Sequence, residues 1–434
     1  MHLAIGGRIL ATGAVPHADA FSATFGGRPW QAHEWLAEAL MALVWRAGGW
    51  TGLCLLFAAA AGLVVGLLTR HVERWLRGTA LLAVVLLSVA CLASSLLARP
   101  HLLALPLTEM WIAELVFARS EARVPSWKRL LPIMVVWANL HGSFIFGLFL
   151  LAAFGLEAMW ARRREGMAAL RPWVLLGAAA GLAAMTSPYG VSNLVLPLRL
   201  NAMGTLSGIG EWAPMDVTRN LPFEAALLAG VFILVWKRVR VAPLPLLLLL
   251  LVTDMSLHHV RHLMLFALVA PLVIAEPLGE ALGAVAPPRR WGLAPTVVGA
   301  LAAALLAAAR LAFPFSPPDS PVAPAAALGH IPPDLKNQPV FNAYAFGGYL
   351  IFSGVRPYID SRAELYGDDF RARYLRLQDD PGALAQELAA RKIAWTLLEP
   401  GSRAAAFLDA SPDWRRLYAD RYAVAHVRAG ATTR

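Results

Sequence analysis

The residues with the clearest potential for chemistry lie in one polar, aromatic stretch near the N-terminus, ahead of a largely apolar chain. The stretch contains Asp19, His33 and Glu34, with Trp35 beside them. A carboxylate in an apolar, partly dehydrated setting has a raised pKa, and it can then act as a general base near neutral pH. We therefore predict Glu34 and Asp19 as catalytic residues, with His33 and Trp35 in contact with substrate.

Both carboxylates also have a structural interpretation. Glu34 precedes a run of apolar residues at helical spacing, and an acidic residue in the first turn of a helix interacts favourably with the helix dipole. The short side chain of Asp19 can accept hydrogen bonds from nearby backbone in a turn. The residue pattern leaves both roles open.

Arg99 and the pair Asn139 and His141 stand between apolar segments. Arg99 could bind a lipid phosphate through charge-assisted hydrogen bonds, or it could extend to the membrane surface from a helix kink. Asn139 and His141 interrupt a hydrophobic run. Polar residues at membrane depth often mark a functional site, although a tight outer loop would give the same pattern.

Two further groups follow. Glu211 and Trp212 form a carboxylate–tryptophan pair of the kind that contacts sugars, because an aromatic face stacks on sugar C–H groups. Arg261 and His262 belong to a dense ionisable cluster that could bind an anionic phosphate or simply end a helix. His258 lies four residues before His262, a spacing that permits metal binding if a third ligand is present.

Near the C-terminus, Asp360 and Arg362 are predicted to pair at the end of a strand, and either a structural or a ligand-binding role fits them. The chain has no Walker loop, dinucleotide fingerprint or nucleophile elbow. These absences argue against an ATP-driven pump and against a Rossmann oxidoreductase.

The composition indicates the framework that positions these residues. Of 434 residues, 58% are hydrophobic and 15% are charged, whereas soluble domains have about 25% charged residues. The net charge of +10 arises largely from short basic loops between apolar segments, a pattern typical of the cytoplasmic side of membrane proteins. No basic–aromatic pattern predicts nucleic-acid binding.

We predict an all-α polytopic membrane bundle of about ten transmembrane helices with a C-terminal extracytoplasmic α/β domain. Apolar blocks long enough to cross a bilayer need roughly 20 residues, and shorter ones are tolerated inside a bundle. The predicted spans are 50–69, 79–97, 101–118, 130–140, 144–160, 173–187, 221–236, 242–254, 259–275 and 293–313.

Four regions follow from this division. They are a first outer loop with an interfacial amphipathic helix, the transmembrane bundle, a Pro/Ala-rich linker and the C-terminal domain, at 1–49, 50–313, 314–338 and 339–434. In the last region, strands are predicted at 339–342, 357–360, 393–398 and 422–427, and helices at 369–378, 381–391 and 402–408.

Several runs resemble bacterial members of the GT-C superfamily of membrane glycosyltransferases, near the protein mannosyltransferase and lipid A aminoarabinose transferase branch. They are PHADAFSATFGGRPWQAHEWLAEAL, RPHLLALPL, WANLHGSFIFG, SPYG, RNLPF and FNAYAFGGYLIFSGVRPYIDSRAELYG. The resemblance covers nearly the whole chain. Because such proteins usually begin with a transmembrane span and an acidic, aromatic stretch, it also implies that this first span lies upstream of Met1.

The resemblance implies a polyprenyl-phosphate-linked sugar as donor and a glycan, lipid or protein as acceptor, with membrane lipids as the surroundings. It places Asp19 and Glu34 in the catalytic loop and Arg99 or Arg261 at the donor phosphate. It further implies a multi-pass protein of the bacterial cytoplasmic (inner) membrane with its C-terminal domain outside. It implies no cofactor and leaves a divalent metal open.

Two alternatives belong to other functional classes. A transporter or lipid flippase would have intramembrane charges along a pathway, but this chain has few such charges and no repeat symmetry. A non-catalytic membrane scaffold would present the C-terminal domain, and substitutions at the candidate catalytic residues would then have no effect.

Overall fold

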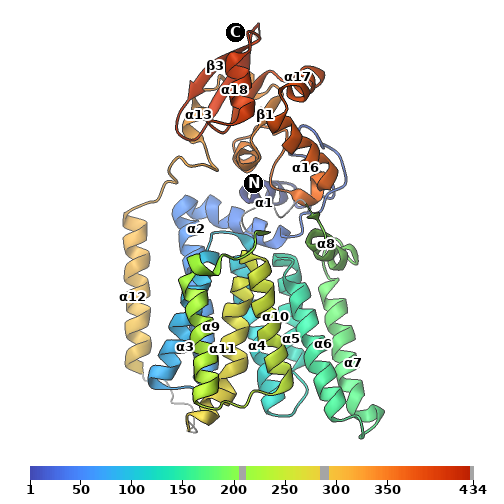
Figure 1. The fold of residues 1–434 in the computed structure, drawn as a ribbon, viewed down its shortest axis with the longest axis vertical. Helices are drawn as coiled ribbons and strands as arrows, with labels where there is room; N and C mark the ends of the chain where they lie inside the picture. The colour runs from blue at the N-terminus through green and yellow to red at the C-terminus, as the bar shows by residue number, and fades with distance from the viewer. Residues whose placement is uncertain (205–211, 284–292, 431–434) are drawn as a thin grey trace. The chain divides into compact units, whose positions relative to one another are not determined.

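The computed structural model describes residues 1–204, 212–283 and 293–430. The chain divides into two compact units, which we call the loop unit and the helical unit. The loop unit comprises Met1–Trp50, Arg199–Leu206 and Phe315–Arg434, and the helical unit comprises Thr51–Leu198 and Ser207–Pro314. Figure 1 shows the ribbon with its element labels.

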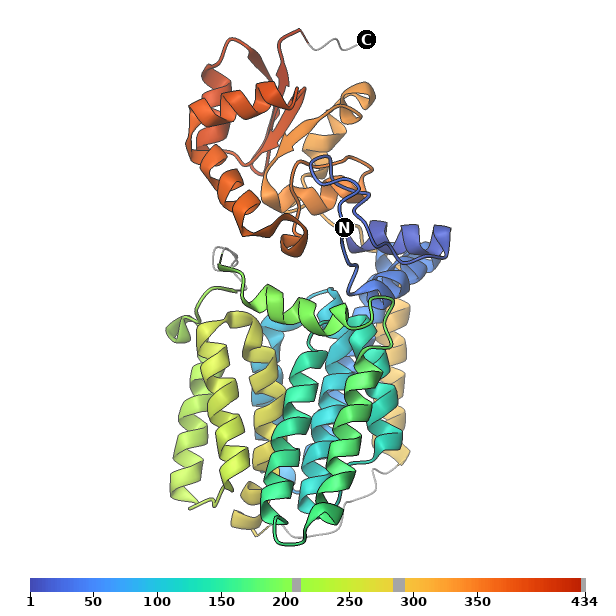
Figure 2. The same ribbon diagram turned by 90° about the vertical axis from the view of Figure 1, so that its right-hand side faces the viewer.

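The helical unit is built mainly from apolar helices, most of which run side by side (Figures 1 and 2). They are the C-terminal part of α2 (Trp35–Val72), α3 (Gly78–Leu92), α4 (Pro100–Ser120), α5 (Trp127–Leu140), α6 (Phe144–Ala161), α7 (Met167–Ala184), α8 (Ser192–Asn201), which continues into the loop unit, α9 (Leu221–Trp236), α10 (Pro243–His258), α11 (Leu263–Ala281) and α12 (Leu293–Ala312).

Two helices form the interior of this bundle. Most residues of α4 and α11 are buried, and the two helices pack against each other. Surrounding helices direct large apolar side chains outward, for example Leu156, Val174 and Val235. A helix that is apolar on its outer face suits a lipid environment, so these helices indicate a multi-pass membrane protein.

The predicted count of about ten spans is not confirmed. Within the described residues, five helices are long and apolar enough to cross a membrane. They are Trp35–Val72, Gly78–Ser95, Pro100–Ser120, Phe144–Ala161 and Val260–Ala281. The apolar helices Leu170–Ala184, Leu221–Trp236, Pro243–His258 and Leu301–Ala312 are shorter.

The loop unit contains a four-stranded sheet in the order β1-β2-β4-β3. Strand β1 (Val340–Asn342) is parallel to β2 (Trp395–Leu398), while β4 (Val424–Arg428) is antiparallel to both β2 and β3 (Trp414–Ala419). The helices of this region are α13 (Ala325–Gly329), α14 (Pro333–Lys336), α15 (Gly347–Phe352), α16 (Ala363–Asp379), α17 (Pro381–Ala390) and α18 (Arg403–Ala410).

The strand predictions at 339–342, 393–398 and 422–427 and the three helix predictions are confirmed. The prediction at 357–360 is wrong, because this segment is a loop between α15 and α16. Its apolar residues are buried by packing rather than by strand pairing. The sequence analysis missed β3, a strand that is largely exposed and therefore lacks a continuous apolar pattern.

The N-terminal loop and the C-terminal region share one hydrophobic core. Ile5 of α1 (His2–Thr12) and Trp30 of the following loop pack in the same buried cluster as Phe341, Tyr358 and Leu384. The predicted regions 1–49 and 339–434 thus both contribute residues to this core. The sequence pattern could not show it, because the contacting residues are more than 300 positions apart in the printed sequence.

Candidate functional site

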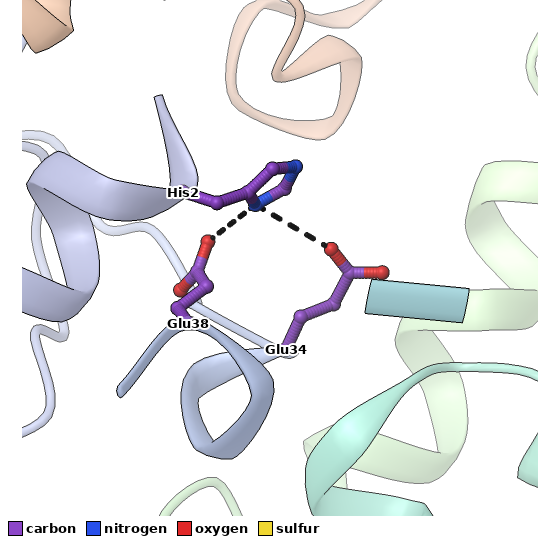
Figure 3. A group of neighbouring side chains, drawn as sticks. All are labelled: His2, Glu34 and Glu38. Atoms are coloured by element: carbon purple, nitrogen blue, oxygen red, sulfur yellow. Dashed lines mark hydrogen bonds and ion pairs between the residues drawn. The ribbon is translucent and has the colours of Figure 1, made fainter. Parts of the chain in front are cut away.

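A histidine and two glutamates meet where α1 approaches the start of α2 (Figure 3). The Nδ1 atom of His2 lies 2.9 Å from Oε1 of Glu38 and 3.8 Å from Oε2 of Glu34. Ligand atoms of all three side chains lie within 4.8 Å of one another. We call these three residues the histidine–glutamate centre.

Local helix geometry places the two carboxylates on one face. The backbone N–H of Glu38 donates to the carbonyl of Glu34 at 3.0 Å, one helical turn earlier. Residues four apart on a helix are neighbours on its surface. The side chain of Glu38 is only 4% exposed, whereas that of Glu34 is 15% exposed, so Glu34 is the more accessible carboxylate.

A glycine lets α1 bring its histidine to these carboxylates. A Cβ atom added to Gly6 would lie 1.9 Å from the backbone oxygen of Glu38, closer than any side chain tolerates. His2 lies one turn before Gly6 on the same face of α1. The close approach of the two helices at Gly6 therefore sets the position of the His2 imidazole.

Charges in this region influence one another strongly. Burial raises the pKa of Glu34, an effect that His33 and His2 partly oppose. Burial alone would lower the pKa of His33, but Glu34, Glu364 and Glu38 together raise it above its ordinary value. The carboxylates of Glu34, Glu38 and Glu364 thus act together on the buried His33 imidazole.

Asp19 has a different environment. Its Oδ1 accepts from the backbone N–H of Phe21 at 2.9 Å, and its Oδ2 accepts from the backbone N–H of Ser22 at 3.1 Å and from the Ser22 hydroxyl. Arg362 donates to Oδ1 from Nη1 at 2.6 Å, and both charged side chains are almost fully buried. Both carboxylate oxygens of Asp19 are thus occupied.

The predicted pair of Asp360 and Arg362 is present and belongs to the same network. Arg362 donates from Nε and Nη2 to the two oxygens of Asp360, and the Tyr366 hydroxyl also donates to Asp360. Burial alone would raise the pKa of Asp19, but Arg362 and the hydrogen bonds from Ser22 and Phe21 hold it below its usual value. These contacts favour a structural role for the network.

His33 and Trp35 are the other candidates in the N-terminal loop. They lie near the histidine–glutamate centre and the network around Arg362. Trp35 packs against the shared core of the loop unit. The Nδ1 atom of His33 is inaccessible and has no hydrogen-bond partner among the described residues. Trp30 donates from its indole nitrogen to Glu364 at 2.9 Å. His33 therefore lies at the edge of the histidine–glutamate centre, while Trp35 supports the fold.

In the helical unit, Asn139 is buried and donates to the backbone oxygens of Val135 and Thr186 at 2.8 and 3.1 Å. His141 accepts from or donates to the Ser143 hydroxyl at 2.9 Å, and its ring lies 6.2 Å from that of His101. Asn139 thus connects the end of α5 to the end of α7.

Arg99 is exposed and immediately precedes α4, where its backbone is extended. This position fits either of the predicted roles, because an exposed cation at a helix start can contact a phosphate or simply lie in solvent.

Trp212, Arg261 and His262 do come together. The Arg261 guanidinium lies 4.2 Å from the centre of the Trp212 ring. The Nδ1 atoms of His259 and His262 contact the backbone oxygens of Trp212 and Met255 at 2.7 and 3.1 Å. Glu211, the predicted partner of Trp212, lies outside the described residues.

Among the residues that the structure describes, His258 and His262 are not joined by a third metal ligand. In the described ranges, the histidine–glutamate centre is the group of three or more side chains that could hold a metal ion. The sequence analysis missed His2 and Glu38 as functional candidates. Their signal was weak, because His2 lies on a separate helix and Glu38 resembles an ordinary polar-face residue.

The fold resembles that of archaeal oligosaccharyltransferases. The crystal structure of the apo enzyme from Archaeoglobus fulgidus aligns with 91% of this chain at a TM-score of 0.53 and 10% sequence identity. The structure of oligosaccharyltransferase AglB from the same organism, in complex with an inhibitory peptide and a dolichol-phosphate, aligns with 92% at a TM-score of 0.51 and 10% identity. No protein-family model and no curated protein sequence matches the chain.

This chain covers 65% of the length of each archaeal protein. At this level of identity the likeness concerns the fold. The aligned part is large enough to include residues of both units of the chain. The chain therefore shares its overall fold with these two archaeal structures.

Proposed function

We propose that this protein is a membrane glycosyltransferase of the GT-C type, which transfers a sugar from a polyprenyl-phosphate donor to a glycan, lipid or protein acceptor on the outer face of the cytoplasmic membrane. The observation that carries the proposal is the likeness in fold to oligosaccharyltransferases over more than nine-tenths of the chain. One of those structures contains a dolichol-phosphate, which is a polyprenyl phosphate.

In the proposed reaction, Glu34 is the carboxylate that faces the acceptor. The acceptor heteroatom forms a bond to C1 of the sugar while the bond from C1 to the phosphate oxygen breaks. The electron pair of the broken bond leaves with the polyprenyl phosphate, and the acceptor proton passes to Glu34. Glu34 suits this role better than Asp19, because Asp19 is fully engaged with Arg362 and backbone donors.

Arg261 is our candidate for binding the donor phosphate within the helical unit. Its guanidinium stacks on Trp212, which fixes the orientation of a planar cation. Arginine binds phosphate through paired, charge-assisted hydrogen bonds. Arg99 remains a second candidate for the same function.

The test uses the purified full-length protein in lipid nanodiscs, with polyprenyl-phosphate-linked mannose and aminoarabinose as donors. A bacterial membrane-lipid extract serves as acceptor, and mass spectrometry measures both free polyprenyl phosphate and the sugar-bearing product. We expect one donor to be consumed. Glu34→Gln should reduce turnover by at least about a hundredfold, in the range typical for loss of a proton-transferring residue.

Glu399→Gln is the matched control, because Glu399 is exposed on the loop unit, away from the histidine–glutamate centre. Its turnover should equal that of the parent protein. Equal turnover in the Glu34→Gln variant would exclude Glu34 as the proton acceptor. Consumption of neither donor, with the protein folded, would contradict transfer of these sugars.

One observation favours the transporter alternative. Glu109 lies in a candidate membrane span, is fully buried and contacts His71, and its second carboxylate oxygen has no hydrogen-bond partner among the described residues. Ionisable residues inside membrane segments often mark a transport pathway. A transporter should move lipid-linked sugar across proteoliposomes without forming product, and Glu109→Gln should abolish that flux.

A further inference from the structure

We propose that the histidine–glutamate centre binds one divalent cation through Nδ1 of His2 and the carboxylate groups of Glu34 and Glu38. The proposal shares Glu34 with the proposed transferase. It rests on the arrangement of the three side chains, and its test measures binding without turnover.

The distances fit a single cation. Metal–nitrogen and metal–oxygen bonds of about 2.0–2.2 Å place adjacent ligand atoms roughly 3 Å apart and opposite ligand atoms roughly 4.2 Å apart. The His2 nitrogen lies 2.9 Å from the Glu38 oxygen and 3.8 Å from the Glu34 oxygen, both within this range. Figure 3 shows the imidazole facing one oxygen of each carboxylate.

Glu38 supplies an independent indication. Its Oε1 contacts His2, but its Oε2 is buried and has no hydrogen-bond partner among the described residues. A buried carboxylate oxygen without a partner is costly. A cation bound at Glu38 would compensate that cost directly, since carboxylates can ligate through one or both oxygens.

Two of the three ligands lie on helices. Glu38 lies in the first turn of α2, His2 lies in the first turn of α1, and Gly6 fixes the close contact of the two helices. Glu34 lies in the turn directly before α2. A site built on helices positions its ligands more accurately than one built on loops.

The ligand set selects the kind of cation. One imidazole nitrogen with two carboxylates suits Mn²⁺ or Zn²⁺, whereas Mg²⁺ and Ca²⁺ prefer oxygen ligands alone. Three protein ligands leave at least one position for water or substrate. The second oxygen of Glu34 points away from His2 (Figure 3), so cation binding leaves the proposed role of this carboxylate in place.

The test uses the full-length protein in detergent, stripped with EDTA and titrated with Mn²⁺. Electron paramagnetic resonance measures the loss of the free Mn²⁺ signal, and Zn²⁺ is added as competitor. We expect one tight site per chain, displaced by Zn²⁺, and a rise in melting temperature on binding. Glu38→Gln and His2→Gln should each weaken Mn²⁺ binding at least about tenfold, since even outer partners of metal ligands have that effect.

Glu399→Gln is the control for nonspecific carboxylate binding and should bind Mn²⁺ as the parent does. Glu38→Gln keeps the shape of the side chain, so its metal-free melting temperature should stay close to that of the parent. If the Glu38→Gln variant fails to fold, the His2→Gln variant still tests the cation site. His2 is partly exposed, so its substitution should leave the fold intact. Absence of a stoichiometric site, or Mn²⁺ affinity unchanged in both variants, would overturn the proposal. Binding without transferase activity would support the cation site and count against the proposed function.

Discussion

Arg362 donates a 2.6 Å hydrogen bond to Asp19, a residue 343 positions earlier in the chain, and both side chains are buried. This ion pair joins the loop that carries Glu34 to the C-terminal region. Because Arg362 also holds Asp360 through two hydrogen bonds, its guanidinium is the centre of a buried network. The C-terminal region is thus part of the structure that supports the candidate site.

Asp19→Asn should destabilise the protein. The substitution leaves the buried Arg362 with one charged partner in place of two, and breaking a buried pair costs about 3 kcal/mol or more. We expect a melting temperature several degrees below that of the parent in detergent. Asp379→Asn is the control, because Asp379 forms an exposed ion pair with Arg403, and such pairs contribute at most about 1 kcal/mol. Equal melting temperatures for both variants would contradict the structural role of Asp19.

The same pair predicts a dependence on pH. The pKa of Asp19 is lower in the folded protein than its ordinary value of 3.8, so its ion pair stabilises the fold above that value and is lost as the pH falls through the folded pKa. The difference in melting temperature between parent and Asp19→Asn should be constant from pH 7 to about 5 and shrink below about 4. If this difference in melting temperature instead grew towards acid pH, the predicted direction of the pH dependence would be wrong.

Gly6→Ala should separate α1 from α2. The added Cβ would collide with the backbone oxygen of Glu38, whereas Gly7 on the same helix has nothing within 4 Å of an added Cβ. We expect Gly6→Ala to lower the melting temperature and to weaken Mn²⁺ binding. Gly7→Ala should be neutral or stabilising by up to about 1 kcal/mol, because alanine favours helix more than glycine does. Identical behaviour of the two variants would show that the helix contact does not control the site.

Asn139→Ala distinguishes the two predicted roles of this residue. Asn139 connects two helix ends through hydrogen bonds to Val135 and Thr186, and leaving buried carbonyl groups unpaired costs about 1–3 kcal/mol. We expect the Asn139→Ala variant to have a lower melting temperature. The Michaelis constant of its folded fraction for the donor should equal that of the parent. Asn337→Ala, at an exposed position, provides the control. A raised Michaelis constant at unchanged stability would instead indicate substrate contact.

Local patterns were sufficient for much of the secondary structure. Apolar residues at helical spacing predicted the helix that begins at Trp35, and the predicted break near residue 49 coincides with the kink at Gly49. Strand β2 was predicted from the largely apolar run at 393–398, and all four of its residues are buried. The length of the apolar helices was harder to judge, since composition does not show where a helix ends.

The sequence by itself determined the abundance of apolar helices, the polar N-terminal loop and the α/β character of the C-terminal region. Only the tertiary structure decided which residues meet. It brought His2 to Glu34 and Glu38 through a helix contact at Gly6, and it buried Asp19 against Arg362. The physical reason is that helix and strand patterns arise from neighbours along the chain. Ion pairs and ligand clusters arise from distant segments that share a core.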